Sequence, residues 1–137
     1  MVGYFEAGHL YIEFEVYGVF IQSKRQIKAQ IDTGYSGYLT LQYPDALPLG
    51  LVLTGTKAYT IADGSTMYSF VALGTISVDG KEIIIPIDIQ PKGAVLIGMQ
   101  LLRKLNKDLF IDFTEEIIKF KDKPIAKQVP STKKLKK

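Results

Sequence analysis

The residues of this sequence best suited to chemistry are the consecutive Asp32, Thr33 and Gly34. Asp32 supplies a carboxylate and Thr33 a hydroxyl that can hydrogen-bond, while Gly34 leaves the backbone free to turn or to approach a ligand closely. Two interpretations are open at this level. The acid can belong to a functional site, or it can satisfy backbone amides in a turn at the end of a strand.

Other reactive groups are scarce, which excludes several classes of chemistry. The chain has no cysteine, so disulfides, thiolate metal sites and cysteine nucleophiles are excluded. His9 is the one histidine, whereas a zinc site needs several ligands, and a Ser-His-Asp triad would need a nucleophile motif that is not recognisable here. We therefore expect no metal and no cofactor, and we expect His9 to be an exposed strand residue.

Strand-like patterns on both sides of Asp32 predict that it lies in a tight loop. Apolar residues alternate with polar ones over 26–31, which is typical of a half-buried strand that ends just before the acid. A second apolar alternation resumes at Leu39, after Gly37. The carboxylate is therefore expected between two strands and near apolar walls.

The rest of the first half is predicted to consist of strands joined by turns. Alternation predicts a strand from Leu10 to Tyr17, and two prolines predict a turn or one short helical turn over 43–50. Extended residues 57–61 and 66–78 flank Asp63-Gly64, and this pair is a strong hairpin signal. The second arm is long, so we expect the tip of this hairpin to project from so small a domain.

A second hairpin and one helix are predicted in the remaining part. Asp79-Gly80 leads into a strand over 81–89, in which Pro86 favours an edge or bulged position. Residues 95–98 are a short apolar run typical of a buried strand, and 99–105 favour a helix. The chain is predicted to close with two short strands, 109–113 and 117–120. The sequence thus predicts an all-β architecture with one short helix.

Charge is divided unevenly along the chain. Residues 1–120 carry 10 lysines and arginines against 13 aspartates and glutamates, whereas 121–137 carry seven lysines against Asp122. We predict one domain over 1–120, long enough to bury a core, and a basic, disordered tail over 121–137. The tail can serve solubility, or it can contact nucleic acid or an acidic partner, although no aromatic residues interleave with its lysines.

No segment of the sequence has the pattern of a membrane anchor or of a secretory signal. The N-terminal residues lack a basic region followed by an apolar one, and no apolar run approaches the ~18 residues of a membrane-spanning helix. We therefore expect a soluble, cytoplasmic protein with no membrane contact.

Three motifs in this order resemble the retropepsin-like aspartic proteases, particularly their non-viral prokaryotic members. The motifs are the Asp-Thr-Gly-Tyr-Ser-Gly loop at 32–37, the hairpin tip at 62–64 with its Ala-Asp-Gly, and the run 96–98 that leads into a short helix. The resemblance covers roughly Leu10 to Phe120. One residue departs from the retroviral members, which have a small residue after the Asp-Thr-Gly where this chain has Tyr35, so no side-chain preference is carried over.

The resemblance implies an all-β, retropepsin-like closed β-barrel with one short C-terminal helix and a flap hairpin, which is homodimeric. It makes Asp32 the catalytic acid, Thr33 the residue whose hydroxyl bonds across the dimer interface, and Gly34 the position where backbone meets substrate. The substrate-binding residues that it implies are Tyr35 and Ser36 in the loop, Tyr59, Ile61, Ala62, Asp63, Gly64 and Ser65 in the flap, and Leu96, Ile97 and Gly98 behind the loop.

The chemistry of this family needs two carboxylates that share one proton, because like charges about 3 Å apart cannot both ionise. The chain has a single Asp-Thr-Gly, so a two-fold symmetric dimer would supply the second Asp32. We therefore predict a homodimeric aspartic endopeptidase that cleaves extended peptides and does not bind nucleic acid. Two alternatives stay open: a catalytically silent dimer that binds peptides or a partner, and a small β-barrel that holds nucleic acid through its lysine tail.

Overall fold

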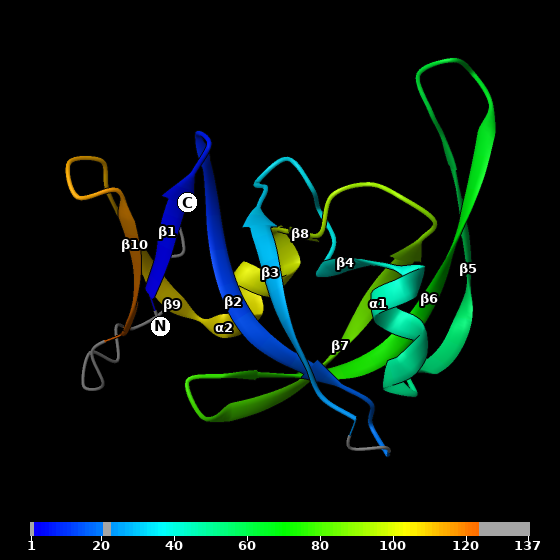
Figure 1. Ribbon diagram of the computed structural model, residues 1–137, viewed down its shortest axis with the longest axis horizontal. Coiled ribbons are helices and arrows are strands. Elements are labelled where there is room, and N and C mark those ends of the chain that lie inside the picture. The colour runs from blue at the N-terminus through cyan, green and yellow to red at the C-terminus, as the bar shows by residue number, and fades with distance from the viewer. Residues whose placement is uncertain (1, 21–22, 124–137) are drawn as a thin grey trace, which may run out of the picture.

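The computed structural model of the protein describes residues 2–20 and 23–123 (Figure 1). Its strands are β1 (Val2–Glu6), β2 (His9–Tyr17), β3 (Arg25–Ile31), β4 (Leu39–Gln42), β5 (Val52–Thr60), β6 (Thr66–Val78), β7 (Lys81–Gln90), β8 (Leu96–Ile97), β9 (Lys107–Asp112) and β10 (Ile117–Asp122). Its helical segments are α1 (Tyr43–Ala46), the 3₁₀ segment η1 (Leu47–Leu49) and α2 (Met99–Leu105). The prediction of a mostly β protein with one short C-terminal helix is confirmed.

The strands form one sheet in the order β5-β6-β7-β4-β8-β3-β2-β1-β10-β9, and β2 pairs in addition with β6. Most neighbours are antiparallel, but β3 with β8 and β4 with β7 are parallel. The short β8 lies between β3 and β4, so a segment from late in the chain sits beside the two strands that flank Asp32. This arrangement positions the site described below.

Alternation along the strands builds the core, as the sequence pattern predicts. In β3 the side chains of Ile27, Ala29 and Ile31 are buried while their neighbours face outward. Leu39 and Leu41 of β4 are buried as well. Both strands that flank the Asp32 loop are thus held by apolar side chains in one core cluster.

The hairpin of β5 and β6 projects from the rest of the molecule, as predicted (Figure 1). β6 pairs with β7 from Phe70 to Val78, but from Thr66 to Ser69 it pairs only with β5 among the described strands. Residues 60–66 at the tip are exposed. The hairpin therefore leaves the sheet at Ser69 and Phe70 and continues as two strands without further support.

The second predicted hairpin is also present, and Pro86 occupies a half-paired position. Asp79 and Gly80 form the turn with positive φ at both residues, 51° and 77°. β7 pairs with β4 only over Ile87–Gln90, so Pro86 lies in the part of β7 that has β6 as its one neighbour. A proline is tolerated there because its missing N–H faces an open edge.

Boundaries differ from the sequence predictions at both ends of the chain. The strand β1 was not predicted, and it pairs with β2 and with β10. At the other end β10 continues to Asp122, two residues into the predicted tail. The disorder predicted for the tail concerns residues that, from 124 onward, lie outside the described part of the chain. No helix within the described ranges combines the length and the apolar character needed to cross a membrane.

Candidate active site

Asp32 follows β3 directly, and both its backbone amide and its backbone carbonyl are hydrogen-bonded. Its amide donates to the carbonyl of Ile97 at 2.9 Å, and its own carbonyl accepts from the Tyr35 amide at 3.1 Å. Its Oδ1 accepts from the Gly34 amide at 2.8 Å, while no partner within the described residues reaches its other carboxylate oxygen. The side chain is half-buried. One oxygen is therefore fixed and the other is available to water or to another acid.

The loop that carries Asp32 also caps helix α2. The first amides of a helix have no partner inside it, and no side chain caps α2. Met99 instead donates to the carbonyl of Tyr35 at 2.8 Å, and Gln100 donates to the carbonyl of Gly37 at 3.0 Å. The Gly98 amide donates to Tyr38 at 3.0 Å. The helix start and the loop thus satisfy each other and fix the position of the acid.

Gly98 is required for this close contact. A Cβ placed on it would lie 2.6 Å from the carbonyl oxygen of Tyr35 and closer still to that of Gly37. Real Cβ atoms do not approach backbone atoms so closely, so any larger residue would push the loop off the helix. The predicted apolar run 96–98 does lie behind the loop, and Leu96 and Ile97 pair with Gln30 and Ile31 of β3.

Tyr35 turns back over this contact. Its ring lies against the Cα positions of Gly37 and Gly98, where a Cβ would clash with it. Its hydroxyl donates to Oδ2 of Asp88 at 2.5 Å. Burial and then the bond to the Asp88 carboxylate raise the pKa of Tyr35, so the phenol stays protonated and acts as a donor. Its role in binding substrate stays a prediction, as does that of the exposed Ser36 beside it.

Sequence reasoning missed Asp88 and Lys57. The alternation of β7 puts Asp88 on the same face as Ile84 and Pro86, which are exposed, yet Asp88 is only 8% exposed. Asp88 accepts the Tyr35 hydroxyl and also forms an ion pair with Lys57, whose Nζ lies 3.2 Å from Oδ2 of Asp88. The one available signal was an acid inside an isoleucine-rich strand, which requires a partner if it is buried.

Thr33 faces a hollow on the outside of the loop. Its side chain is exposed, and its hydroxyl has no hydrogen-bond partner within the described residues. The hollow has a volume of about 480 Å³. Its lining residues come from the loop, from α2 and from the segment that follows α2. They are Thr33, Met99, Leu102, Arg103, Asn106, Lys107, Leu109 and Lys123. An unpartnered hydroxyl therefore stands at the rim of a partly apolar depression.

The predicted flap residues lie together at the end of the projecting hairpin, apart from the Asp32 loop (Figure 1). Oδ1 of Asp63 accepts from the amide and from the hydroxyl of Ser65, at 2.8 and 2.6 Å. Gly64 has a φ of 88°, which favours glycine. Ala62 is exposed beside them, and Tyr59 is half-buried between the arms. The tip has a defined turn of its own, and no hydrogen bond or ion pair among the described residues joins it to Asp32.

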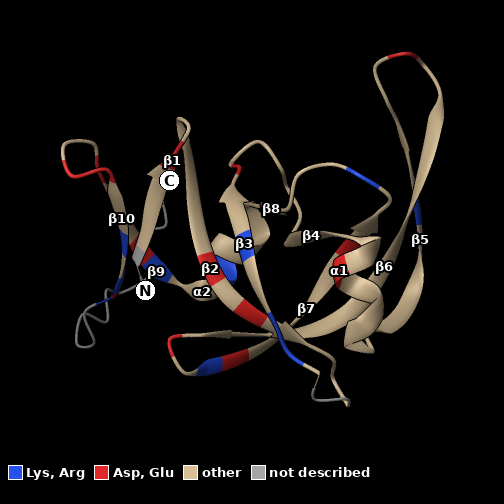
Figure 2. Cartoon of the chain, viewed as in Figure 1, with Lys and Arg blue, Asp and Glu red and all other residues tan. Residues whose placement is uncertain are grey.

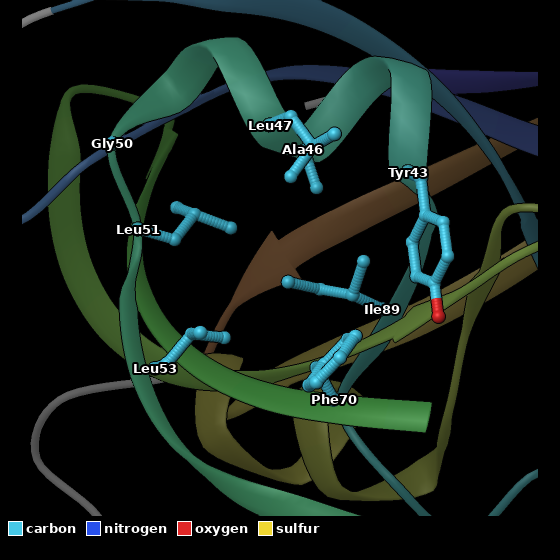
Figure 3. Close-up of a pocket in the computed structure, with 8 residues that line it drawn as sticks. All are labelled: Tyr43, Ala46, Leu47, Gly50, Leu51, Leu53, Phe70 and Ile89. Atoms are coloured by element: carbon cyan, nitrogen blue, oxygen red, sulfur yellow. The ribbon is translucent and has the colours of Figure 1, made fainter. Parts of the chain in front are cut away.

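A second cavity, which is mostly apolar, lies at the base of the hairpin. It measures about 420 Å³ and contains no residue of the Asp32 loop (Figure 3). Its lining residues are Tyr43, Ala46, Leu47, Gly50, Leu51, Leu53, Phe70 and Ile89. The Tyr43 hydroxyl is the one polar side-chain group in its lining, so the cavity offers no pair of acid and base groups. Within the described residues, no three histidine, aspartate or glutamate side chains come together as a metal site requires.

Solved structures of retroviral proteases share this architecture. EIAV protease, solved in complex with the inhibitor HBY-793, aligns with a TM-score of 0.62 and 14% identity over 79% of this chain and 98% of its own. The protease of Simian Foamy Virus (mac) aligns with a TM-score of 0.50 and 16% identity over 71% of this chain and 98% of its own. The chain has the retropepsin fold. No protein-family model and no curated protein sequence matches it.

The retropepsin fold confirms the coarser part of the sequence prediction. The order of the loop, the projecting hairpin and the run behind the loop is the order in which the sequence motifs were found. The sequence identities are too low to carry a function from those proteases to this chain, so function is argued from the site.

Proposed function

We propose that this chain is an aspartic endopeptidase of the non-viral retropepsin-like type, active as a homodimer on extended peptides. The observation that carries the proposal is the Asp32 carboxylate, which stands half-buried on a loop locked to α2, with one oxygen fixed by Gly34 and the other without a partner in the described chain. The loop residues Tyr35-Ser36-Gly37 and the tip residues 62–64 support the non-viral type. The additional pairing of β2 with β6 supports a closed barrel.

The reaction requires the Asp32 carboxyls of two subunits to share one proton. The ionised group takes a proton from water as the water oxygen attacks the peptide carbonyl carbon. The other group gives its proton to the carbonyl oxygen, and a neutral diol results. When the diol collapses, one of its hydroxyls returns a proton to the second carboxylate, and the leaving nitrogen takes the proton held by the first. The C–N bond breaks, and the pair again holds one proton.

The hollow beside Thr33 supports the proposed dimer. A second copy placed over it would bury Met99, which is 39% exposed, and would give the Thr33 hydroxyl a partner. β9 lies at one end of the sheet, and Phe110 and Phe113 near it are 51% and 73% exposed. Large exposed apolar side chains of this kind mark an interaction surface.

The projecting hairpin supports a flap. Such a lid excludes water from the carboxylates and orders over a bound peptide. In this proposal Gly34 meets the peptide backbone from below, and the tip residues meet it from above. The proposed peptide-binding residues are Tyr35, Ser36, Tyr59, Ile61, Ala62, Asp63, Gly64, Ser65 and Leu96. The other two residues predicted from the sequence, Ile97 and Gly98, are buried, so in this proposal they support the loop from behind.

A peptide library tests the activity directly. We expect the full chain to cleave a mixed peptide library at some pH between about 3 and 8, and a statine-type inhibitor to block cleavage. Asp32→Asn should reduce turnover to background while sedimentation still shows a folded dimer. Cleavage that persists in this variant, or wild-type protein that binds the inhibitor without cleaving any peptide, would overturn the proposal in favour of other catalytic residues or of a silent binding dimer.

A further inference from the structure

The base of the flap hairpin and the loop of Asp32 are joined by side chains. The hairpin leaves the sheet where β6 loses its pairing with β7, at Phe70. Lys57 on β5 is paired with Ser69, the first residue of β6 beyond that point. Its Nζ lies 3.2 Å from Oδ2 of Asp88, on β7. A charged contact therefore spans the position about which the projecting part of the hairpin would bend.

The contact extends to the Asp32 loop. The same Oδ2 of Asp88 accepts the hydroxyl of Tyr35 at 2.5 Å, and the carbonyl of Tyr35 accepts the first amide of α2. Lys57 is the only charged residue in the sequences of β5 and β6, and the blue segment on β5 in Figure 2 marks it. No other side chain in these two strands can form an ion pair with an acidic residue of the domain.

We propose that Tyr35, Asp88 and Lys57 form a positioning network that couples the base of the flap to the loop carrying Asp32. None of the three needs to touch the reacting atoms. The network rests on the proposed function only where it concerns catalysis, since its coupling of two structural elements is independent of turnover.

The physical reason is that Asp88 depends on both of its partners, the Tyr35 hydroxyl and the Lys57 ammonium. Asp88 is nearly buried, and a buried carboxylate is costly without hydrogen bonds and an opposite charge. If the flap arm moves and withdraws Lys57, the Tyr35 hydroxyl is the one side chain left to stabilise the negative charge of Asp88. If the loop moves and withdraws Tyr35, Lys57 alone remains. A displacement at one end is therefore opposed at the other.

Amide exchange tests the coupling without any need for activity. In Lys57→Met we expect exchange to rise about fivefold at residues 58–68, as expected for loss of a partly exposed ion pair. We expect it to rise also at Met99 and Gln100, whose amides bind the loop. Tyr35→Phe should raise exchange at the same two places. Lys57→Arg keeps the charge and should stay near the wild type.

The matched control is Lys28→Met, which breaks an ion pair with Glu6 on a different part of the sheet. It should change exchange at neither place. If Lys57→Met affects only the flap and Tyr35→Phe only the loop, the coupling is refuted. If wild-type protein cleaves no peptide but exchange is coupled, the proposed function fails and the network stands.

Kinetics separate positioning from general stability when the protein cleaves peptides. Lys57→Met should raise KM about fivefold by loosening flap closure, and Tyr35→Phe should lower kcat by disturbing the loop. The double variant should lose less than the product of the two single effects, because the network is already broken. Effects that multiply independently would contradict the inference.

Discussion

The Asp32 loop and the flap hairpin are both short connections between strands, yet they are held in opposite ways. The loop gives carbonyls to three amides at the start of α2 and takes one bond from β8. The outer half of the hairpin has only its own cross-strand pairs and the turn at its tip. A reacting acid must keep its position within a fraction of an ångström, whereas a cover must move. The difference therefore matches the two tasks that we propose.

Glycine is used differently in the two regions, and this makes the comparison testable. Gly98 is needed because backbone atoms come too close for any side chain. Gly64 has open space around it and is needed because its φ of 88° is strained for other residues. Crowding should affect the stability of the whole domain, while strain at an exposed tip should act locally.

Gly98→Ala should have the largest effect. The added methyl must displace the carbonyls of Tyr35 and Gly37, which overpacks a buried contact at a cost of about 3 kcal/mol. For a domain of this size we expect the melting temperature to fall by roughly 10 °C, as measured by calorimetry. Gly55→Ala is the control, because nothing lies within 4 Å of its added Cβ, and it should melt within about 2 °C of the wild type. Equal melting of both variants would show that the loop is not locked.

Gly64→Val should have the next largest effect, and that effect should be a loss of peptide cleavage rather than of stability. A β-branched residue at this positive φ is strained by about 1–2 kcal/mol, which distorts the tip. We expect kcat/KM to fall about tenfold while the dimer and the melting temperature change little. Gly8→Val introduces the same strain, at a φ of 80° in the turn between β1 and β2, and should leave kcat/KM unchanged. If both variants cleave equally well, the tip has no part in the reaction.

The loop was predictable from the sequence because its signals are local. A strand pattern, an acid, glycines and a resumed strand pattern all lie within residues 26–41, and the hairpin tip is equally marked by Asp63-Gly64. Helix α2 was predicted with its observed bounds for the same reason. Local turn chemistry and periodicity suffice where one short segment contains the whole signal.

The rest of the site could not be predicted because it depends on contacts between distant segments. Alternation puts Asp88 on an outward face, and only the folded chain brings Tyr35 and Lys57 over it. The strand β1 pairs with β10 from the other end of the chain, and no local pattern reports such a pairing. Burial of a polar residue is set by what covers it, which periodicity does not contain.

Thr33→Ala tests whether the Asp32 loop is stabilised further by a second copy of the chain, through a hydrogen bond to the Thr33 hydroxyl. Loss of one hydroxyl bond in each subunit should cost about 1 kcal/mol per bond, or roughly a 30-fold rise in the dimer dissociation constant. Sedimentation over a concentration series measures this, and specific activity should follow the dimer fraction. Thr33→Ser keeps the hydroxyl and should restore most of the association. A fully active monomer would rule out the shared pair of acids.

Acid should loosen the turn at the flap tip, and this is the smallest effect that we expect. The Ser65 hydroxyl, and then the Ser65 amide, lower the pKa of Asp63 below its ordinary value of 3.8. A lowered pKa means that Asp63 stabilises the turn above its ordinary pKa, and that this support is lost as the pH falls through the lower, folded value. The amide shift of Ser65, followed by NMR, should therefore titrate with a midpoint below 3.8. Asp63→Asn keeps an acceptor oxygen that cannot titrate and should abolish the transition at Ser65. A midpoint at or above 3.8 would mean that the carboxylate does not hold the turn.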